Sequence, residues 1–133
     1  MKRIYVTHCS AKKSDALRDS GQRASPDKLY TSPRIQTFMS RCKEQGVNWA
    51  IFSDRYGIWF PNVEHEWYEK GPDTVTDQEF QDLLNDFDFK LQDYDEIWFY
   101  HNPSRFHGLY QRLLQETSLQ DKIRLFSHYW EIA

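Results

Sequence analysis

The sequence predicts one α/β domain built in three layers, with helices on both faces of a mainly parallel sheet of about four strands. Four short runs rich in β-branched and aromatic residues alternate with stretches whose apolar residues recur at helical spacing. Each run ends abruptly in polar side chains, which is typical of strands that lead into a site at the carboxyl edge of an open sheet. The length of 133 residues matches a single domain, so we expect one domain spanning 1–133.

The first strand and the first helix are separated by a long polar segment. Residues 3–7 predict the strand, and residues 14–27, which contain glycine and proline, are typical of a loop. Ser32 is placed to cap the helix, with Pro33 at its first position and Gly46 as its stop.

The middle of the chain predicts a second strand and a second helix. Residues 49–53 form a continuous apolar run, as expected for a strand buried on both faces. Residues 58–61 predict a short extended piece, and residues 62–75 are irregular. Thr76 and Glu79 then form a capping box that starts the helix.

The last part of the chain predicts a strand over 97–100, a third helix, and a final strand over 122–126. Asn102 followed by Pro103 has the pattern of a cap and a first helical residue. We therefore expect the third helix to start there.

The composition argues against several classes of protein. A net charge of −3, from 17 basic and 20 acidic residues, disfavours binding of nucleic acid mainly through its phosphates, although a pocket could still take one base or nucleotide. The two cysteines make no disulfide framework, and the cysteines and histidines lack recognised ligand spacings, so we expect no metal and no cofactor. Without a long apolar run or a signal peptide, the sequence predicts a cytoplasmic protein with no membrane partner.

Parallel strands bring their carboxyl ends to one edge of a sheet, so the polar residues after the four strands are expected to gather there. These residues are His8 and Cys9, Ser53 and Asp54, His101 and Asn102, and Ser127 and His128. This convergence predicts a functional site at the carboxyl edge.

Cys9 is a candidate nucleophile at the end of the first strand. Its neighbour His8 would point to the opposite face of the sheet, so His101 or His128 would be the better base. Lys12 and the lysine after it would lower the pKa of the thiol by their charge. The alternative is that Cys9 is a small buried residue that closes the strand.

The turn after the first strand is a candidate anion site. Ser10, Lys12, Lys13 and the backbone amides of the turn could hold a phosphate or a carboxylate. The glycines of a phosphate-binding loop are missing. The alternative is a solvated basic turn.

The segment after the second strand offers a second set of candidates. Asp54 could act as a base or bind a ribose hydroxyl, Tyr56 could stack on a base, and Gly57 permits a tight turn. Alternatively, Asp54 pairs with Arg55 and Tyr56 is a core ring. Tyr68, in an irregular acidic loop, is either part of a lid over the strand ends or an aromatic plug in the core.

The first half of the sequence contains the segments Cys9-Ser10-Ala11-Lys12-Lys13, Leu29-Tyr30-Thr31-Ser32 and Phe52-Ser53-Asp54-Arg55-Tyr56-Gly57, followed by Tyr68. In these segments it resembles a group of small uncharacterised prokaryotic and phage domains. That group is similar to the core domain of archaeosine synthase, an enzyme of tRNA 7-deazaguanine modification. Cys9 and Lys13 match the Cys-x-x-x-Lys portion of its motif, and Tyr30 and Ser32 would supply the tyrosine and the serine.

That core domain is in turn similar to the uracil-DNA glycosylase fold, whose active site lies at the carboxyl ends of a four-stranded parallel sheet. The last strand of that fold ends in a motif with a histidine, which His128 would match. The resemblance implies a uracil-DNA glycosylase-like fold and an activity on nucleic-acid bases.

We therefore expect a pocket for a nucleobase, a nucleotide or a similar ligand, in a protein that modifies nucleic-acid bases or hydrolyses a glycosidic bond, with tRNA or DNA as the larger partner. The alternatives are a non-catalytic module that binds a ligand or tRNA beside a separate enzyme, and an interaction protein of phage or antiphage defence. The expected catalytic residues are Cys9, Lys13, Asp54, His101 and His128. The expected ligand-binding residues are Ser10, Lys12, Tyr30, Ser32, Ser53, Tyr56, Gly57, Tyr68 and Asn102.

Overall fold

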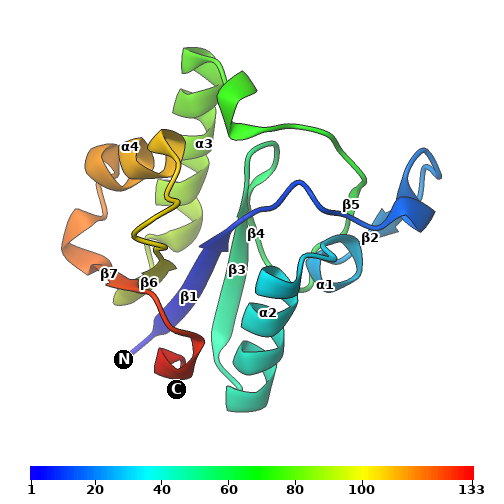
Figure 1. The fold of residues 1–133 in the computed structure, drawn as a ribbon. Helices are drawn as coiled ribbons and strands as arrows, with labels where there is room; N and C mark the ends of the chain where they lie inside the picture. Colours follow the sequence, from blue (N-terminus) through cyan, green and yellow to red (C-terminus); the bar gives the residue numbers. More distant parts are fainter.

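The computed structural model describes residues 1–133 and has a mixed α/β fold around a five-stranded sheet. The strand order is β4-β3-β1-β6-β7 (Figure 1). The parallel strands are β1 (Arg3–His8), β3 (Asn48–Ser53), β6 (Glu96–Tyr100) and β7 (Ile123–Phe126). The extended piece predicted after β3 is β4 (Gly57–Trp59), which pairs with β3 in the antiparallel sense. The prediction of a mainly parallel sheet is therefore confirmed, with β4 as an additional edge strand.

The helices and a second, small sheet fill the segments between these strands. The α-helices are α1 (Pro26–Leu29), α2 (Pro33–Gln45), α3 (Asp77–Leu91) and α4 (Gly108–Glu116). Short 3₁₀ turns are η1 (Asp15–Leu17), η2 (Pro72–Thr74), η3 (Gln120–Lys122) and η4 (Tyr129–Glu131). The small sheet pairs β2 (Arg23–Ala24) with β5 (His65–Glu66), so the two long loops of the sequence are joined to each other. None of the helices combines the length and the apolar character needed to cross a bilayer.

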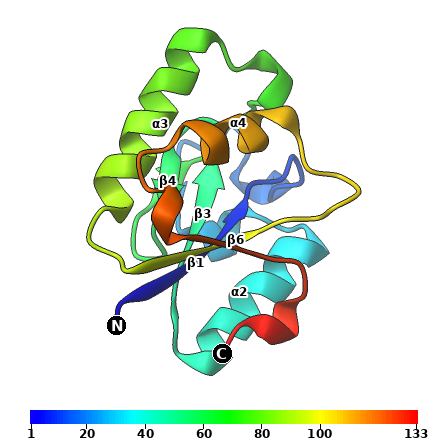
Figure 2. The same ribbon diagram turned by 90° about the vertical axis from the view of Figure 1, so that its left-hand side faces the viewer.

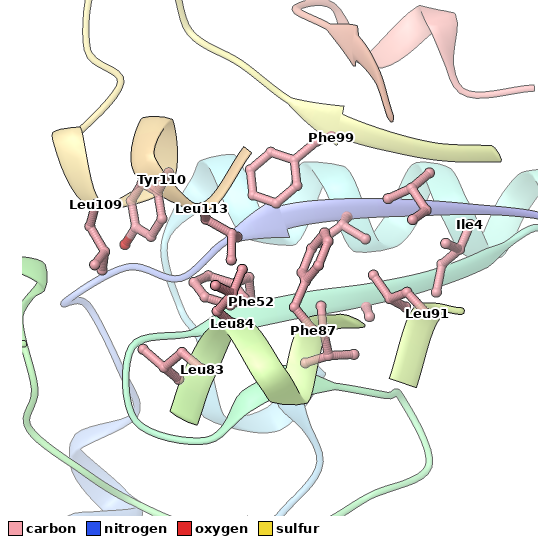
Figure 3. Close-up of a cluster of buried hydrophobic side chains, with 14 of the residues drawn as sticks. Ile4, Phe52, Leu83, Leu84, Phe87, Leu91, Phe99, Leu109, Tyr110 and Leu113 are labelled. Carbon is pink, nitrogen blue, oxygen red and sulfur yellow. The ribbon is translucent and has the colours of Figure 1, made fainter. Parts of the chain in front are cut away.

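Helices cover both faces of the main sheet, as predicted. α2 lies on one face, and α3 and α4 lie on the other (Figure 1, Figure 2). On the α3 and α4 side, aromatic rings pack between strands and helices: the ring of Phe87 lies 6.2 Å from that of Phe52 and 6.5 Å from that of Phe99 (Figure 3). On the α2 side, the ring of Phe38 meets the edge of Trp49 at 6.3 Å. Rings thus supply much of the apolar area buried on each face.

The order of the strands creates one switch point in the sheet. From β1 the chain goes to β3 on one side and then crosses to β6 on the other side of β1. In open α/β sheets, ligands bind beyond the carboxyl ends of the strands at such a point. The end of β1, at His8, is therefore the place where the topology favours a site.

The starts of α2 and α3 agree with the prediction from the sequence, but the predicted capping role of Ser32 is wrong. α2 begins at Pro33 and ends at Gly46, whose φ of 64° is left-handed, yet the hydroxyl of Ser32 makes no capping hydrogen bond. The fixed φ of proline therefore starts α2 without help from that hydroxyl. α3 begins with the predicted capping box: Thr76 Oγ1 accepts from the Glu79 amide at 3.2 Å, and Glu79 Oε1 accepts from the Thr76 amide at 2.9 Å.

The prediction that the third helix begins at Pro103 is wrong. The Asn102 side chain accepts hydrogen bonds from the amide and the hydroxyl of Ser104, at 3.0 and 2.8 Å, and so holds a local turn instead of a helix. α4 begins five residues later, where His107 Nδ1 accepts from the Leu109 amide at 3.0 Å. The residues between Tyr100 and Gly108 therefore form a loop above the sheet edge.

Gly57 makes the turn between β3 and β4 possible. Its φ is 75°, and a Cβ added to it would lie 2.2 Å from Asp86 Oδ2. That carboxylate accepts a hydrogen bond from the Ile58 amide at 2.8 Å and pairs with Lys90 at 2.8 Å. The close approach of Gly57 and Ile58 to Asp86 holds β4 against α3.

Candidate ligand site at the carboxyl edge of the sheet

A cavity of about 190 Å³, called the tip pocket below, opens where the loops after β1, β3 and β6 meet. It is lined by His8, Cys9, Ser10, Ala11, Asp54, Lys70, Gly71, Pro72, Arg105, His107 and Tyr110. A larger and more open hollow, of about 880 Å³, lies at the opposite edge of the sheet around Lys2, Asn48 and Ala133. That hollow contains none of the predicted site residues, so the tip pocket is the candidate site.

Asp54 is the central polar group of the tip pocket. Its side chain follows β3 and is only 3% exposed. Tyr110 Oη donates a hydrogen bond to Asp54 Oδ1 at 2.8 Å, and the Asp54 amide donates to Cys9 Sγ at 3.4 Å. Burial raises the pKa of Asp54 above its ordinary value, although the hydrogen bond from Tyr110 opposes this shift. The carboxyl group is therefore fixed in position and favours the protonated form more than an exposed aspartate does.

Cys9 lies against Asp54 on the α2 side of the sheet. Its Sγ is 3.9 Å from Tyr110 Oη, and the residue is 7% exposed. Burial, followed by the charge of Asp54, raises the pKa of the Cys9 thiol to about 12. The expectation that the following lysines lower this pKa is wrong, because the loss of hydration outweighs their charge. Cys9 is a neutral thiol at physiological pH.

The ammonium group of Lys13 lies over the rings of Trp67 and Tyr68. Its Nζ is 4.3 Å from the centre of the Tyr68 ring, and burial lowers its pKa. Tyr30 Oη and Tyr68 Oη form a hydrogen bond of 2.5 Å, and both residues are buried in the α2-side core beside Cys9. Tyr68 is therefore the core plug of the two alternatives, and neither tyrosine lines the tip pocket.

The residues at and after the end of β3 pack beside the tip pocket, and of these only Asp54 lines it. The buried Ser53 hydroxyl accepts hydrogen bonds from the amides of Arg55 and Tyr56, at 3.2 and 3.0 Å. The Tyr56 ring stacks on His65 at 3.9 Å, and its hydroxyl donates to the Glu66 carbonyl at 3.1 Å. The predicted Asp54–Arg55 alternative does not occur, because Arg55 lies over the Tyr56 ring instead.

Two of the predicted bases lie outside the tip pocket. The backbone of His101 is tied to β7 by a hydrogen bond to the Phe126 carbonyl at 2.8 Å, and its ring packs on Phe106 at 4.6 Å. His128 is exposed and stacks on Trp130 at 5.6 Å. The structure thus provides Cys9 with no histidine base from either strand end.

The remaining predicted ligand contacts divide into two groups. Ser10 lines the tip pocket, and its hydroxyl accepts from the Lys12 amide at 3.2 Å. Lys12 is exposed beside the pocket without lining it, and Ser32 and Asn102 are absent from its wall. The anion site expected in the turn after β1 is reduced to Ser10 and the backbone around it.

Several pocket residues were missed by the sequence-based prediction. Tyr110 lies in the apolar stripe of α4, and nothing in its spacing marks it as the partner of Asp54. Arg105 and His107 enter the wall because α4 starts late. The His8 ring stacks on Tyr110 at 4.6 Å, on the face opposite to Cys9, as strand alternation predicts.

Arg34 binds backbone oxygen atoms at the end of β1. Its guanidinium donates to Thr7 Oγ1 at 2.7 Å and to the carbonyl oxygens of His8 and Cys9 at 3.1 and 3.3 Å. Arg34 is the second residue of α2, and its planar group with five N–H donors can bind several backbone acceptors at once. Arg34 therefore fixes the backbone that carries His8 and Cys9.

These features define the protein as an α/β domain with a mainly parallel five-stranded sheet and a small polar pocket at its switch point. Comparison with protein-family models, with curated proteins and with solved structures gives no significant match. No group of three or more histidine, cysteine, aspartate or glutamate side chains is placed to hold a metal ion.

Proposed function

We propose that this protein binds a nucleobase or a nucleotide in the tip pocket. The observation that carries the proposal is the Asp54 carboxyl group at the switch point of the sheet. It is almost fully buried, yet none of the ion pairs of the structure includes it. An unpaired buried carboxyl group lowers stability unless its environment compensates, so its position in a cleft marks a functional site.

The size of the site supports a ligand larger than a single ion. A second hollow of about 470 Å³ shares Asp54 and Lys70 with the tip pocket and adds Arg55 and Tyr56 to its wall. The two hollows together fall in the range of ligand pockets, about 300–1,000 Å³. We expect a planar base to lie beside Asp54 and a phosphate to lie near Arg105 of the tip pocket, because the carboxylates of Glu79, Asp82 and Asp86 line the second hollow together with Arg55.

The chemistry of the pocket supports a base as the recognised part. Asp54 accepts or donates hydrogen bonds according to its protonation, and Ser10 and the backbone of the β1 turn add further polar contacts. The Tyr110 hydroxyl, which holds Asp54 in place, also belongs to this wall, and the Tyr110 ring is stacked against His8. A small site with a few fixed polar groups recognises polar ligands through hydrogen bonds.

A second candidate function is hydrolysis of a glycosidic bond, in a uracil-DNA glycosylase-like fold. The raised pKa of Asp54 supports it, because burial makes this carboxylate a stronger base than an exposed aspartate. In this reaction the oxygen of a water molecule bonds to the sugar carbon, the carbon–nitrogen bond breaks, and the electron pair leaves with the base. Asp54 takes the proton of the water. The buried neutral thiol of Cys9 argues against a covalent route through that residue.

The two candidates are tested with one set of proteins: the wild type, Asp54→Asn, and Asp93→Asn as control. Asp93 is exposed and lines neither hollow, so its substitution leaves the proposed site intact. Isothermal calorimetry with free bases, nucleosides and mononucleotides should show binding to the wild type and to the control, and at least about tenfold weaker binding to Asp54→Asn. Binding that is equal in all three proteins would contradict the role of Asp54.

Turnover separates binding from catalysis. Each nucleoside or nucleotide that binds is incubated with the three proteins, and release of the free base is followed by chromatography. Release by the wild type but not by Asp54→Asn supports hydrolysis. Binding without release leaves the protein as a ligand-binding module and contradicts the second candidate. If no base, nucleoside or nucleotide binds, the proposed function is wrong.

A further inference from the structure

One wall of the tip pocket is formed by an irregular segment, residues 69–74, which is called the strap below. The strap connects β5 to α3 and passes above the carboxyl ends of β1 and β3 (Figure 1). Three of its residues, Lys70, Gly71 and Pro72, line the tip pocket. Its only regular structure is the short turn η2, so neither a strand ladder nor an α-helix holds the strap in place.

The strap is anchored at both ends. Before it, Tyr68 is only 4% exposed, and its hydroxyl is hydrogen-bonded to that of Tyr30 at 2.5 Å. After it, Val75 packs against the core on the α3 and α4 side, and Thr76 caps α3. Loop residues next to fixed elements absorb the changes in φ and ψ when a loop moves, so the strap can swing between these two anchors without disturbing the core.

Two side-chain hydrogen bonds join the strap to other elements, and no further one does so. Lys70 Nζ donates to Glu79 Oε1, in the first turn of α3, at 3.0 Å. His107 Nδ1 accepts from the Leu109 amide, so its proton is on Nε2, which donates to Asp73 Oδ1 at 2.7 Å. The bond between Asp73 and His107 is the one that ties the middle of the strap to α4.

The bond between Asp73 and His107 is exposed to water. The Asp73 side chain is 88% exposed and that of His107 is 38% exposed. An exposed pair of this kind stabilises its closed geometry only modestly. Segments held by few and exposed bonds open locally far more often than the whole protein unfolds.

The position of the strap separates two hollows. The tip pocket, of about 190 Å³, is smaller than the roughly 300–1,000 Å³ of ligand pockets, and the second hollow measures about 470 Å³. Asp54 and Lys70 are the residues that line both, so they lie at the boundary between them. Because Lys70 belongs to the strap and Asp54 does not, a movement of the strap opens this boundary and leaves Asp54 in place.

We propose that the strap is a lid over the tip pocket, closed in this structure, and that the bond between Asp73 and His107 is its latch. Opening withdraws Lys70 from the boundary, joins the two hollows into one cavity, and gives a ligand access to Asp54. Closing returns Lys70 to Glu79 and shuts the ligand in. The inference rests on the proposed function only for the identity of the ligand that enters.

The lid leaves the thiol of Cys9 covered in both states. Cys9 Sγ lies against Tyr110 Oη and accepts from the Asp54 amide, and the residue belongs to the core on the α2 side. None of these contacts is with the strap.

Limited proteolysis with trypsin measures the opening without any ligand. Lys70 is a trypsin site whose side chain is only 19% exposed and is paired with Glu79. Lys90, which is paired with Asp86 inside α3, is the matched reference for unfolding of the whole protein. The initial rate of cleavage after Lys70, followed by mass spectrometry, should exceed that after Lys90 by at least about tenfold, because cleavage follows the population of the open form. Equal rates would overturn the inference.

Variants of the latch test whether its bond controls the opening. Asp73→Ala should speed cleavage after Lys70 by about threefold. His107→Asn keeps a side chain that can cap α4 but lacks the nitrogen that reaches Asp73, so it should have the same effect. Because both substitutions remove one bond, the double variant should be no faster than either single variant.

The control for these variants is Asp77→Ala. It removes another exposed carboxylate that binds α4, through Arg112 at 3.1 Å, and it lies outside the strap. Its cleavage rate after Lys70 should equal that of the wild type. Effects that add in the double variant, or an equal effect in the control, would overturn the assignment of the latch.

Binding kinetics test whether the lid controls access to the site. With the mononucleotide that the wild type binds most tightly, Asp73→Ala should raise the association and dissociation rates in stopped-flow measurements by about threefold each, and should change Kd little. Unchanged rates would overturn the lid and leave the proposed function standing. If no base or nucleotide binds, the proposed function is wrong, and the proteolysis results still decide whether the strap opens.

Discussion

The stability of the protein should fall when the pH is lowered from 7 to 4, and His8 should cause much of this fall. The pKa of its imidazole is lowered from 6.5 to about 4 in the folded protein, first by burial and then by Arg34. Below pH 6.5 the unfolded chain therefore takes up a proton that the folded protein takes up only near pH 4. Stability is lost through that window, and the pKa difference corresponds to about 3 kcal/mol. This is a large share of a typical unfolding free energy of about 5–15 kcal/mol.

Other groups titrate in the same region, among them His65 and Asp54, so the effect of His8 has to be measured as a difference. Burial lowers the pKa of His65 as well, which adds a loss of the same sign. Asp54 acts in the opposite direction: its raised pKa contributes stability at low pH that is lost as the pH rises from its unfolded value of 3.8 through its folded one. His8→Phe keeps both of these groups and removes only the imidazole.

The assay is urea unfolding of the wild type and His8→Phe at pH 7, 5.5 and 4, with His128→Phe as a control at an exposed histidine. The free energy of unfolding of the wild type should fall relative to that of His8→Phe by about 3 kcal/mol across this range, and the control should follow the wild type. If the wild type and His8→Phe change in parallel, the imidazole is not held neutral by its surroundings.

Three further predictions use matched pairs of positions. Gly57→Ala should lower the free energy of unfolding by at least about 2 kcal/mol more than Gly21→Ala does. Both glycines have a positive φ, but only a Cβ at position 57 would meet the carboxylate of Asp86. Equal losses in urea unfolding would show that this carboxylate moves aside freely. Thr76→Ala should cost about 1 kcal/mol, since its hydroxyl caps α3, and Ser32→Ala less than about 0.5 kcal/mol, since its hydroxyl caps nothing; the reverse order would contradict the assigned caps. The thiol of Cys9 should react with a colorimetric disulfide reagent at pH 8 only as fast as the protein unfolds, and a reaction as fast as that of free cysteine would contradict its burial and its raised pKa.

The strands and the edge on which the site lies could be predicted from the sequence, because both depend on local patterns. Apolar runs of strand length mark the strands, and the abrupt change to polar residues marks their carboxyl ends. Cys9, Ser10 and Asp54 were found in this way, and all three line the tip pocket. Each lies directly at or after the end of β1 or β3, which are neighbours in the sheet.

The order of the strands could not be predicted, and it decides which strand ends meet. β7 is one of the two edge strands, and β6 separates it from β1. With neighbouring strands about 4.8 Å apart, His128 starts about 10 Å from the end of β1 and turns away to stack on Trp130. His101 follows the adjacent strand β6, but its backbone is bound to β7 and its ring to Phe106. The order in which the strands pair, which no local sequence pattern encodes, therefore places both predicted bases away from Cys9.

The wrong helix start and the missed pocket residues have the same physical cause. Had α4 begun at Pro103, as the cap pattern predicted, the residues up to His107 would have been helical. The Asn102 side chain instead closes a turn, and the loop that follows places Arg105 and His107 in the wall of the tip pocket.

The late start of α4 also explains why one tyrosine organises the site. From the first turn of α4, Tyr110 binds Asp54 through its hydroxyl, contacts Cys9 through the same atom, and stacks on His8 through its ring. The polar groups at the ends of β1 and β3 therefore share one rigid neighbour. Because a change in any of them acts on Tyr110, substitutions at His8, Cys9 and Asp54 should couple in double-mutant cycles, and it is this shared contact that makes the three strand-end residues one site.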